Sequence, residues 1–250
     1  MRINFIIDCD RNFLAVIWAL NKEDSPQEFK IEETLSDYRV DRVLRKRIKE
    51  IISSEDFMGE LGKSKRLYDI YTRNIRTWRE YFNKYYDNLK KAKAEYNLFF
   101  KDYDFSQLEK YADFFGGRFP KEADFYLCIG CTNGWGRHSG ISDNQFISFP
   151  RYSENFIYEN FLKDLPVIFH ELIHLPQMKY YKKEEREFIE MVTRAFAPRG
   201  IIINEHLLDK NLPEAEMISI IKKALSENRT YFDIKSELYE IYTRHRSGGI

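Results

Sequence analysis

The sequence lacks the cysteine pattern of a disulfide-stapled secreted protein. It contains three cysteines, Cys9, Cys128 and Cys131, in 250 residues. This number is odd and too small for a framework of paired bridges, which small extracellular domains use in place of a large core. The cysteine content therefore favours a reducing compartment.

A net charge is also missing, because 40 basic side chains are balanced by 40 acidic ones. A chain without a charge excess creates no overall field that would attract nucleic acid or an anionic membrane surface. We therefore expect neither kind of partner. The chain also shows no internal repeat and no low-complexity tract.

Long hydrophobic runs are absent. Asp8 and Asp10 break the apolar stretch at the start, so it lacks the apolar core of a signal peptide, and the run from Phe13 to Leu20 is too short to cross a bilayer. If the chain is given from its natural start, we expect a cytoplasmic protein. Aromatic residues are plentiful at 16 %, which predicts a well-filled core and amphipathic surfaces that could hold a peptide.

The most informative stretch is the motif His170-Glu171-Leu172-Ile173-His174, which lies in an apolar run. Pro166 fits the first turn of a helix, where a missing N–H costs nothing. On a helix, positions four apart lie on nearly the same face, so both imidazoles can point at one ion. Burying these polar groups on so apolar a helix would be costly unless a metal or a partner satisfied them.

Zinc fits this pattern. A catalytic zinc site takes three protein ligands, among which imidazole nitrogen is common, and keeps one position open for water. Glu171, directly after the first histidine, could take a proton from that water once the metal has made it more acidic. We therefore expect Zn²⁺ as the cofactor, with His170 and His174 as ligands and Glu171 as the catalytic base.

Residues from about Cys128 to Ala197 resemble the zincin metallopeptidases. In that superfamily an edge strand before the motif helix holds an extended peptide substrate by backbone hydrogen bonds. The stretch from Gly140 to Pro150 alternates between apolar and polar residues and is similar to such a strand. The resemblance implies a zinc-dependent peptidase that acts on peptides or proteins.

The third ligand distinguishes branches of this superfamily. The metzincin pattern would need glycine and histidine where this chain has Gln177 and Tyr180. The chain is more similar to the gluzincins, in which a glutamate from the next helix completes the site. That helix is expected over 183–197, and it offers Glu190 as the preferred ligand and Glu187 as the reserve.

One feature of this helix argues against Glu190. The apolar residues define a face that lies nearly opposite to it, which alone would place Glu190 in solvent. However, Thr193 and Ala197 flank Glu190 with small side chains. A second helix could therefore approach at this point and bury the carboxylate on both sides.

Four further residues are candidate substrate contacts. Arg137 and His138 belong to a glycine-containing loop just before the expected edge strand, where they could bind substrate side chains or a terminal carboxylate. Ser148 lies on that strand. His206 follows the ligand helix and is either a weaker candidate ligand or a contact to the substrate.

We expect an α+β fold that is predominantly helical, with a small sheet whose edge strand precedes the motif helix. A single zincin-like domain over 1–250 is expected, with a mostly helical part over 1–115 and the sheet, motif helix and C-terminal helices over 120–250. The expected strands are 3–7, 123–129 and 140–150. The expected helices are 10–19 capped by Asp10, 26–52, 63–97 as one helix or two, 106–116 begun by a capping box at Ser106, 213–228 and 232–246. A hairpin over 3–20 competes with the first strand and helix.

Two alternatives belong to other functional classes. The chain could be a binding or regulatory module that keeps the zincin shape without turnover. It could also be a helical interaction protein built on the tyrosine-rich stretch over 63–97, with the histidines in the core and no metal. The sequence does not indicate the oligomeric state.

Overall fold

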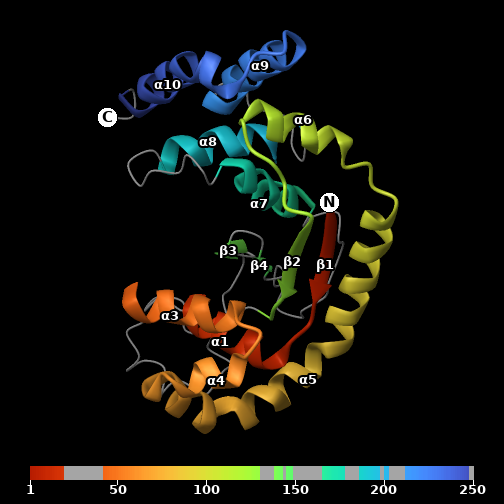
Figure 1. Cartoon of the computed structure of the whole chain (residues 1–250), viewed down its shortest axis with the longest axis vertical. Helices are drawn as coiled ribbons and strands as arrows, with labels where there is room; N and C mark the ends of the chain where they lie inside the picture. Colours follow the sequence, from red (N-terminus) through yellow and green to blue (C-terminus); the bar gives the residue numbers. More distant parts are fainter. Residues whose placement is uncertain are drawn as a thin grey trace. The chain divides into compact units, whose positions relative to one another are not determined.

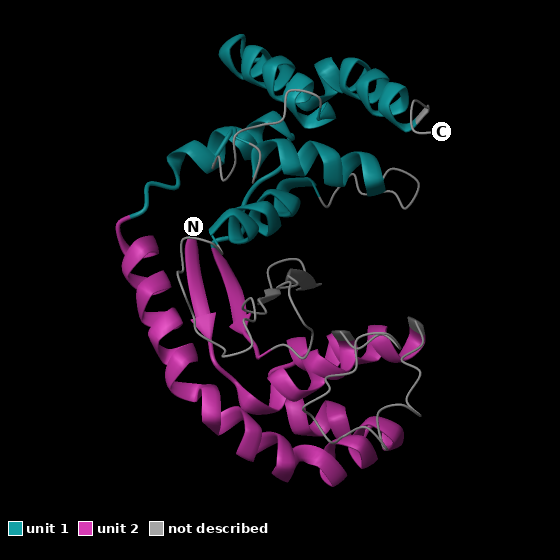
Figure 2. Ribbon diagram, turned by 180° about the vertical axis from the view of Figure 1, so that it is seen from behind, with its two compact units in different colours: residues 1, 103–121, 162–250 teal, residues 2–102, 122–161 magenta. Residues whose placement is uncertain are grey.

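The computed structural model describes residues 1–19, 42–129, 138–142, 145–148, 165–177, 186–197, 200–202 and 212–247. These residues are predominantly helical and include one small sheet (Figure 1). They divide into two compact units, one of residues 1, 103–121 and 162–250 and the other of residues 2–102 and 122–161 (Figure 2).

The second of these units contains a four-stranded sheet in the order β1-β2-β4-β3. The strands are β1 (Arg2–Ile6), β2 (Glu122–Leu127), β3 (His138–Ser142) and β4 (Gln145–Ser148). β2 pairs in parallel with both β1 and β4, whereas β3 pairs antiparallel with β4. The predicted strands 3–7 and 123–129 are therefore confirmed within one or two residues at their ends.

The single strand expected over 140–150 is wrong. The structure has two antiparallel strands there, with β4 inside the sheet and β3 at its edge. Between them the sequence has Asp143 and Asn144, residue types whose short polar side chains favour turns. The alternation of apolar and polar residues identified the strand propensity but did not weigh this pair as a break.

α1 (Cys9–Ala19) follows β1 directly, which excludes the competing hairpin over 3–20. Its N-terminus is capped by Asp8, not by Asp10 as predicted. The Oδ1 atom of Asp8 accepts hydrogen bonds from the backbone N–H groups of Asp10 at 3.0 Å and Arg11 at 2.9 Å. A carboxylate outside the helix satisfies N–H groups that would otherwise lack partners, whereas Asp10 already lies in the first turn.

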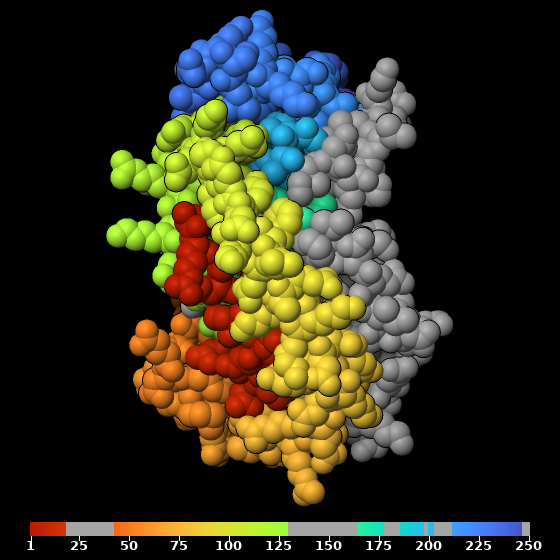
Figure 3. Space-filling model, turned by 90° about the vertical axis from the view of Figure 1, so that its right-hand side faces the viewer, coloured from red at the N-terminus to blue at the C-terminus, as the bar shows by residue number. Residues whose placement is uncertain are grey.

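Three more helices belong to this unit: α3 (Arg42–Ser53), α4 (Phe57–Gly62) and α5 (Lys65–Lys101). α5 is one continuous helix of 37 residues, which decides between the two arrangements left open for 63–97. Its buried residues include Trp78, Phe82 and Tyr96, and the Tyr96 ring stacks on Phe5 of β1 at 4.8 Å between centroids. Figure 3 shows β1 and α1 beside α5, so this aromatic stripe packs inside the unit.

The other unit is formed by helices around one apolar core. They are α6 (Ser106–Phe114), α7 (Leu165–Gln177), α8 (Arg186–Phe196), α9 (Pro213–Ser226) and α10 (Tyr231–Ser247). The core is built from apolar side chains of all five helices, among them Phe196, Ile221 and Leu238, which are fully buried. The expected helices over 213–228 and 232–246 are confirmed with small shifts at their ends.

The start of α6 differs from the capping box predicted at Ser106. Asp104 takes the capping role, because its carboxylate accepts hydrogen bonds from both the backbone N–H and the hydroxyl of Ser106. These bonds hold the pKa of the Asp104 carboxyl below its usual value. The stronger acceptor therefore displaced the hydroxyl group that the sequence pattern had selected.

The residues that end α6 pack closely against the last turn of α7. Gly116 ends α6 with a positive φ of 64°, which a side chain would make strained. Gly117 donates its N–H to the Ala112 carbonyl and lies directly against Pro176 in the last turn of α7. A Cβ atom at Gly117 would come within 2.5 Å of the Pro176 carbonyl oxygen, so only glycine permits this approach.

A search of the described helices for a segment that could cross a membrane, by length and apolar character, found none.

Candidate metal site

α7 places the two histidines of the motif on one face. Their rings lie 4.8 Å apart between centroids, and their Nε2 atoms are 3.2 Å apart. The neighbouring Phe169, Leu172 and Ile173 are buried and hold α7 in the core. The helix is therefore fixed by its apolar residues while the imidazoles turn to a partly exposed side.

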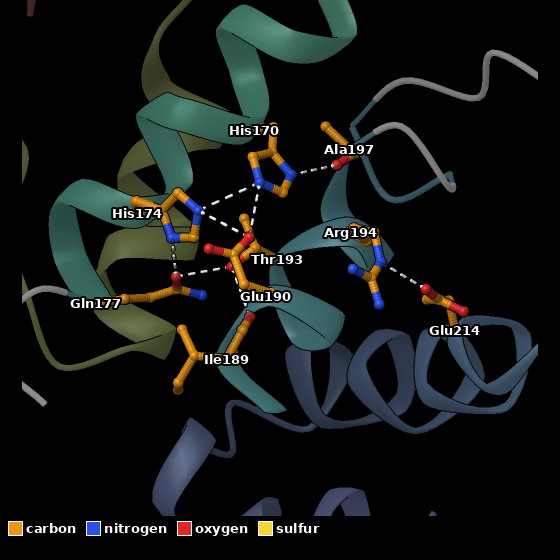
Figure 4. A network of polar contacts seen from close by, with 9 residues as sticks. All are labelled: His170, His174, Gln177, Ile189, Glu190, Thr193, Arg194, Ala197 and Glu214. Carbon is orange, nitrogen blue, oxygen red and sulfur yellow. Dashed lines mark hydrogen bonds and ion pairs between the residues drawn. The ribbon is translucent and has the colours of Figure 1, made fainter. Parts of the chain in front are cut away.

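α8 brings Glu190 to the same point. Its Oε2 atom lies 3.3 Å from the Nε2 of His170 and 3.5 Å from the Nε2 of His174. The three side chains each offer one ligand atom, and all three atoms lie within 4.8 Å of one another. Figure 4 shows the three groups converging between α7 and α8. They could hold a metal ion.

The small residues after Glu190 permit this approach, as the sequence indicated. Thr193 is buried against Gln177 of α7, and the carbonyl of Ala197 faces His170. α7 therefore packs against α8 on the side that carries Glu190. The carboxylate becomes partly buried there, with 30 % of its side chain exposed.

The partner of His170 determines which of its nitrogens can bind metal. Its Nδ1 lies 3.0 Å from the carbonyl oxygen of Ala197. A carbonyl only accepts, so this bond assigns the proton to Nδ1. The lone pair is then on Nε2, which faces Glu190 and His174. A hydrogen bond from the second ring nitrogen is the usual way in which proteins orient a metal-binding histidine.

His174 is oriented by a side chain instead. Its Nδ1 lies 3.1 Å from Oε1 of Gln177, and the hydroxyl of Thr193 donates to the same oxygen at 2.8 Å. Gln177 is 1 % exposed, and its Nε2 has no hydrogen-bond partner in the part of the chain that is described. With its oxygen toward His174, the amide accepts from the Nδ1–H tautomer of the ring, in which Nε2 is the atom that could bind a metal.

Electrostatics favour an ionised Glu190. Burial by itself would raise the pKa of this carboxyl group, but the hydrogen bonds and charges of His170 and His174 in their protonated form lower it well below its ordinary value. The ionised carboxylate is the better hydrogen-bond acceptor, and it is also the form that binds metal. Two imidazole nitrogens and one carboxylate oxygen form a donor set that suits zinc and other first-row divalent ions.

The reserve ligand Glu187 lies elsewhere. Its Oε2 atom accepts a hydrogen bond from the hydroxyl of Tyr242 at 3.2 Å, and it is not among the groups that converge on the site. Glu171 lies on α7 next to His170 and is partly exposed. Of the expected ligands, the structure thus brings together His170, His174 and Glu190.

The four candidate substrate contacts are placed differently. His138 and Ser148 are paired with each other across β3 and β4. They belong to the unit that contains the sheet, whereas the metal-site residues belong to the other unit. Arg137 and His206 lie outside the described residues.

Sequence reasoning missed one contact of the site and one ion pair of the helix that carries Glu190. It used Gln177 only to exclude the metzincin pattern, although a buried amide three residues after His174 is well placed to orient that ring. It also did not consider Arg194, which follows Glu190 by one helical turn and pairs with Glu214 of α9 at 2.7 Å. The spacing of four residues was the available signal for Arg194.

Comparison of this chain with protein-family models, with curated proteins and with solved structures found no match.

Proposed function

We propose that this chain is a zinc-dependent peptidase of gluzincin type, in which His170, His174 and Glu190 hold the ion. The observation that carries this proposal is the convergence of three ligand atoms within 4.8 Å of one another. Both imidazoles also direct the lone pair of Nε2 to that point, because Ala197 and Gln177 accept from Nδ1. A core pair of histidines would need no such common orientation.

The donor set supports zinc. Catalytic zinc sites commonly take two histidines and one glutamate and leave one position open. When bound, zinc would supply a Lewis acid that polarises a substrate carbonyl and makes water more acidic. The residues on α7 and α8 would supply the ligands, and Gln177 and Ala197 would hold the imidazoles in the ligand tautomer.

Glu171 is proposed as the general base. It follows His170 on α7, and its side chain is partly exposed rather than sealed in the core. From this position its carboxylate would accept a proton from water and later pass it to the leaving amine. The proposed substrate is an extended peptide, and the contacts expected from the sequence, His138, Ser148, Arg137 and His206, stay predictions.

Metal analysis and a pair of substitutions test this function. We expect protein purified without added metal and then exchanged into Zn²⁺ to retain about one ion per chain. Glu171→Gln should retain that ion and lose peptide hydrolysis, because the amide cannot take the proton. His170→Ala should lose both the ion and hydrolysis. The measurements are elemental analysis and cleavage of a quenched-fluorescence peptide library.

His245→Ala is the matched control, because His245 is exposed near the end of α10 and is not part of the convergent cluster. It should retain the ion. A wild-type protein that takes up no divalent ion would exclude the metal site. If the wild type and Glu171→Gln both bind zinc and neither cleaves any peptide, the result would instead favour a binding or regulatory module.

A further inference from the structure

Arg194 lies one helical turn after Glu190 on α8. Positions four apart on a helix face the same side, with about 5–6 Å between their Cβ atoms. Figure 4 shows Arg194 beside the cluster of His170, His174 and Glu190, with Glu214 on its far side. The side chain of Arg194 therefore leaves α8 on the side that also carries Glu190.

Glu214 of α9 anchors this arginine. The Nε atom of Arg194 donates to Oε1 of Glu214 at 2.7 Å, and Glu214 is only 4 % exposed. A buried carboxylate needs a partner, so this pair holds the guanidinium in place. The bond uses one of the five N–H donors of the arginine, and the described residues provide no hydrogen-bond partner for its Nη1 and Nη2.

A purely structural arginine in the same chain is arranged differently. Arg11, in the other unit, uses Nε, Nη1 and Nη2 to bind the Ile52 carbonyl, Asp8 and the Ser54 carbonyl, and 20 % of its side chain is exposed. Arg194 is 40 % exposed although its Nε is fixed. Its Nε is therefore fixed, and its other four N–H donors have no partner among the residues that the structure describes.

We propose that Nη1 and Nη2 of Arg194 bind a carboxylate of the peptide substrate. This inference rests on the proposed function, because it assigns a preference to the same site. One helical turn rises about 5.4 Å, and an extended peptide advances about 3.3–3.6 Å per residue. A carboxylate one or two residues from the group on the metal would therefore come within reach of a guanidinium, which binds carboxylates with two parallel hydrogen bonds.

The carboxylate could be the C-terminus of the substrate or an acidic side chain. Four short peptides that carry a metal-chelating hydroxamate at one end would distinguish these sources. Two end in Gly and differ only in a free or amidated C-terminus. Two are amidated and differ only in Glu or Gln at the residue after the chelating group. Binding to the Co²⁺-loaded protein is followed by the visible spectrum of cobalt, which requires no turnover.

For the wild type, we expect one carboxylate peptide to bind at least roughly ten-fold more tightly than its amide partner, as a charge-assisted pair implies. Arg194→Gln should reduce this ratio to about one. Arg194→Gln alone leaves the Glu214 carboxylate buried without its cation, which could destabilise the fold. The double variant Arg194→Gln with Glu214→Gln avoids this, because two amides can form a neutral hydrogen-bonded pair. Glu214→Gln alone should retain the preference, since Arg194 keeps its charge.

Arg244→Gln is the matched control, because it removes the same charge from another arginine that pairs with a glutamate of α9. Arg244 of α10 lies 3.2 Å from Glu216. Arg244→Gln should leave the ratio unchanged. Equal binding of the carboxylate and amide peptides of both pairs by the wild type would overturn the role of Arg194. An unchanged affinity ratio in the Arg194→Gln and Glu214→Gln double variant would do the same. Neither result would affect the proposed metal site. Failure of the protein to bind Co²⁺ would overturn the metal site, and this inference with it.

Discussion

Single residues orient the two histidines in different ways. His170 donates to the backbone carbonyl of Ala197, which no side-chain substitution removes. His174 donates to the side chain of Gln177, which is itself held by the hydroxyl of Thr193. The orientation of His174 can therefore be altered by substituting Gln177, without changing any of the three candidate ligands.

Replacing Gln177 by Met should weaken metal binding. The change keeps an unbranched side chain of similar length in the buried space but removes the acceptor for Nδ1 of His174. Loss of such an outer hydrogen bond commonly costs about 10–100-fold in metal affinity. The affinity is measured by competition with a chromogenic chelator, and thermal unfolding checks that the fold is retained.

Gln107→Met on α6 is the matched control, because Gln107 is exposed and the chemical change is the same. It should leave metal affinity unchanged. If Gln177→Met bound zinc as tightly as the wild type, the amide would not orient His174, although the three ligands could still hold the ion.

Glu190 shows how far sequence reasoning reaches at this scale. The motif located His170 and His174, and the spacing of small residues after Glu190 indicated that a helix could approach there. The helical wheel alone favoured solvent for Glu190, because it considers one helix without its neighbour. The orienting contacts of Ala197 and Gln177 depend on how α7 and α8 pack together, and that packing has no local signature in the sequence.

At the scale of elements, the contact between α6 and α7 depends on Gly117. This residue touches the backbone of Pro176, one residue before Gln177. The glycine therefore sets how closely the end of α6 can approach the helix that carries both histidines.

Gly117→Ala should destabilise the fold by about 1–3 kcal/mol, the usual cost of forcing extra atoms into a packed site. The added Cβ would meet the carbonyl oxygen and Cα of Pro176, which are backbone atoms and cannot rotate away. Urea unfolding measures the loss. Gly62→Ala is the control, because a Cβ atom there meets nothing within 4 Å, so a neutral or slightly stabilising effect is expected. Equal stability of the two variants would contradict the close approach.

The type of most elements could be predicted, whereas their ends were predicted only to within a few residues and their caps were not. Apolar periodicity was sufficient for α5, α9 and α10, because each buries one continuous face. The cap of α1 was assigned to Asp10 instead of Asp8 because these two acidic residues are separated by only one residue, and only the backbone path decides which carboxylate reaches the free N–H groups. The division into β3 and β4 was missed although the two strands are neighbours in sequence, because Asp143 and Asn144 were not weighed as a break between them.

At the scale of the whole chain, we expect metal binding to stabilise one of the two compact units more than the other. All three ligands belong to one unit. A ligand that binds only the folded state stabilises it, by about 2.7 kcal/mol at a concentration 100 times the dissociation constant. Local opening should therefore become rarer in that unit than in the other one.

Hydrogen exchange measured by mass spectrometry tests this expectation. Saturating Zn²⁺ should slow exchange in peptides from α7 and α8, whereas peptides from α1 and β1 should exchange at nearly unchanged rates. His170→Ala should show no zinc-dependent slowing in either unit. Uniform protection of all peptides would show that the two units open together, and no protection anywhere would argue against the site.

The order of the units along the chain has a practical consequence. Residues 122–161, which supply β2, β3 and β4, interrupt the helical unit between α6 and α7. No single truncation therefore yields either unit whole: a fragment that stops at 102 loses most of the sheet, and one that starts at 162 loses the helix on which α7 rests. Isolating the unit that contains the candidate metal site requires excising an internal segment and joining residue 121 to residue 162 through a designed linker.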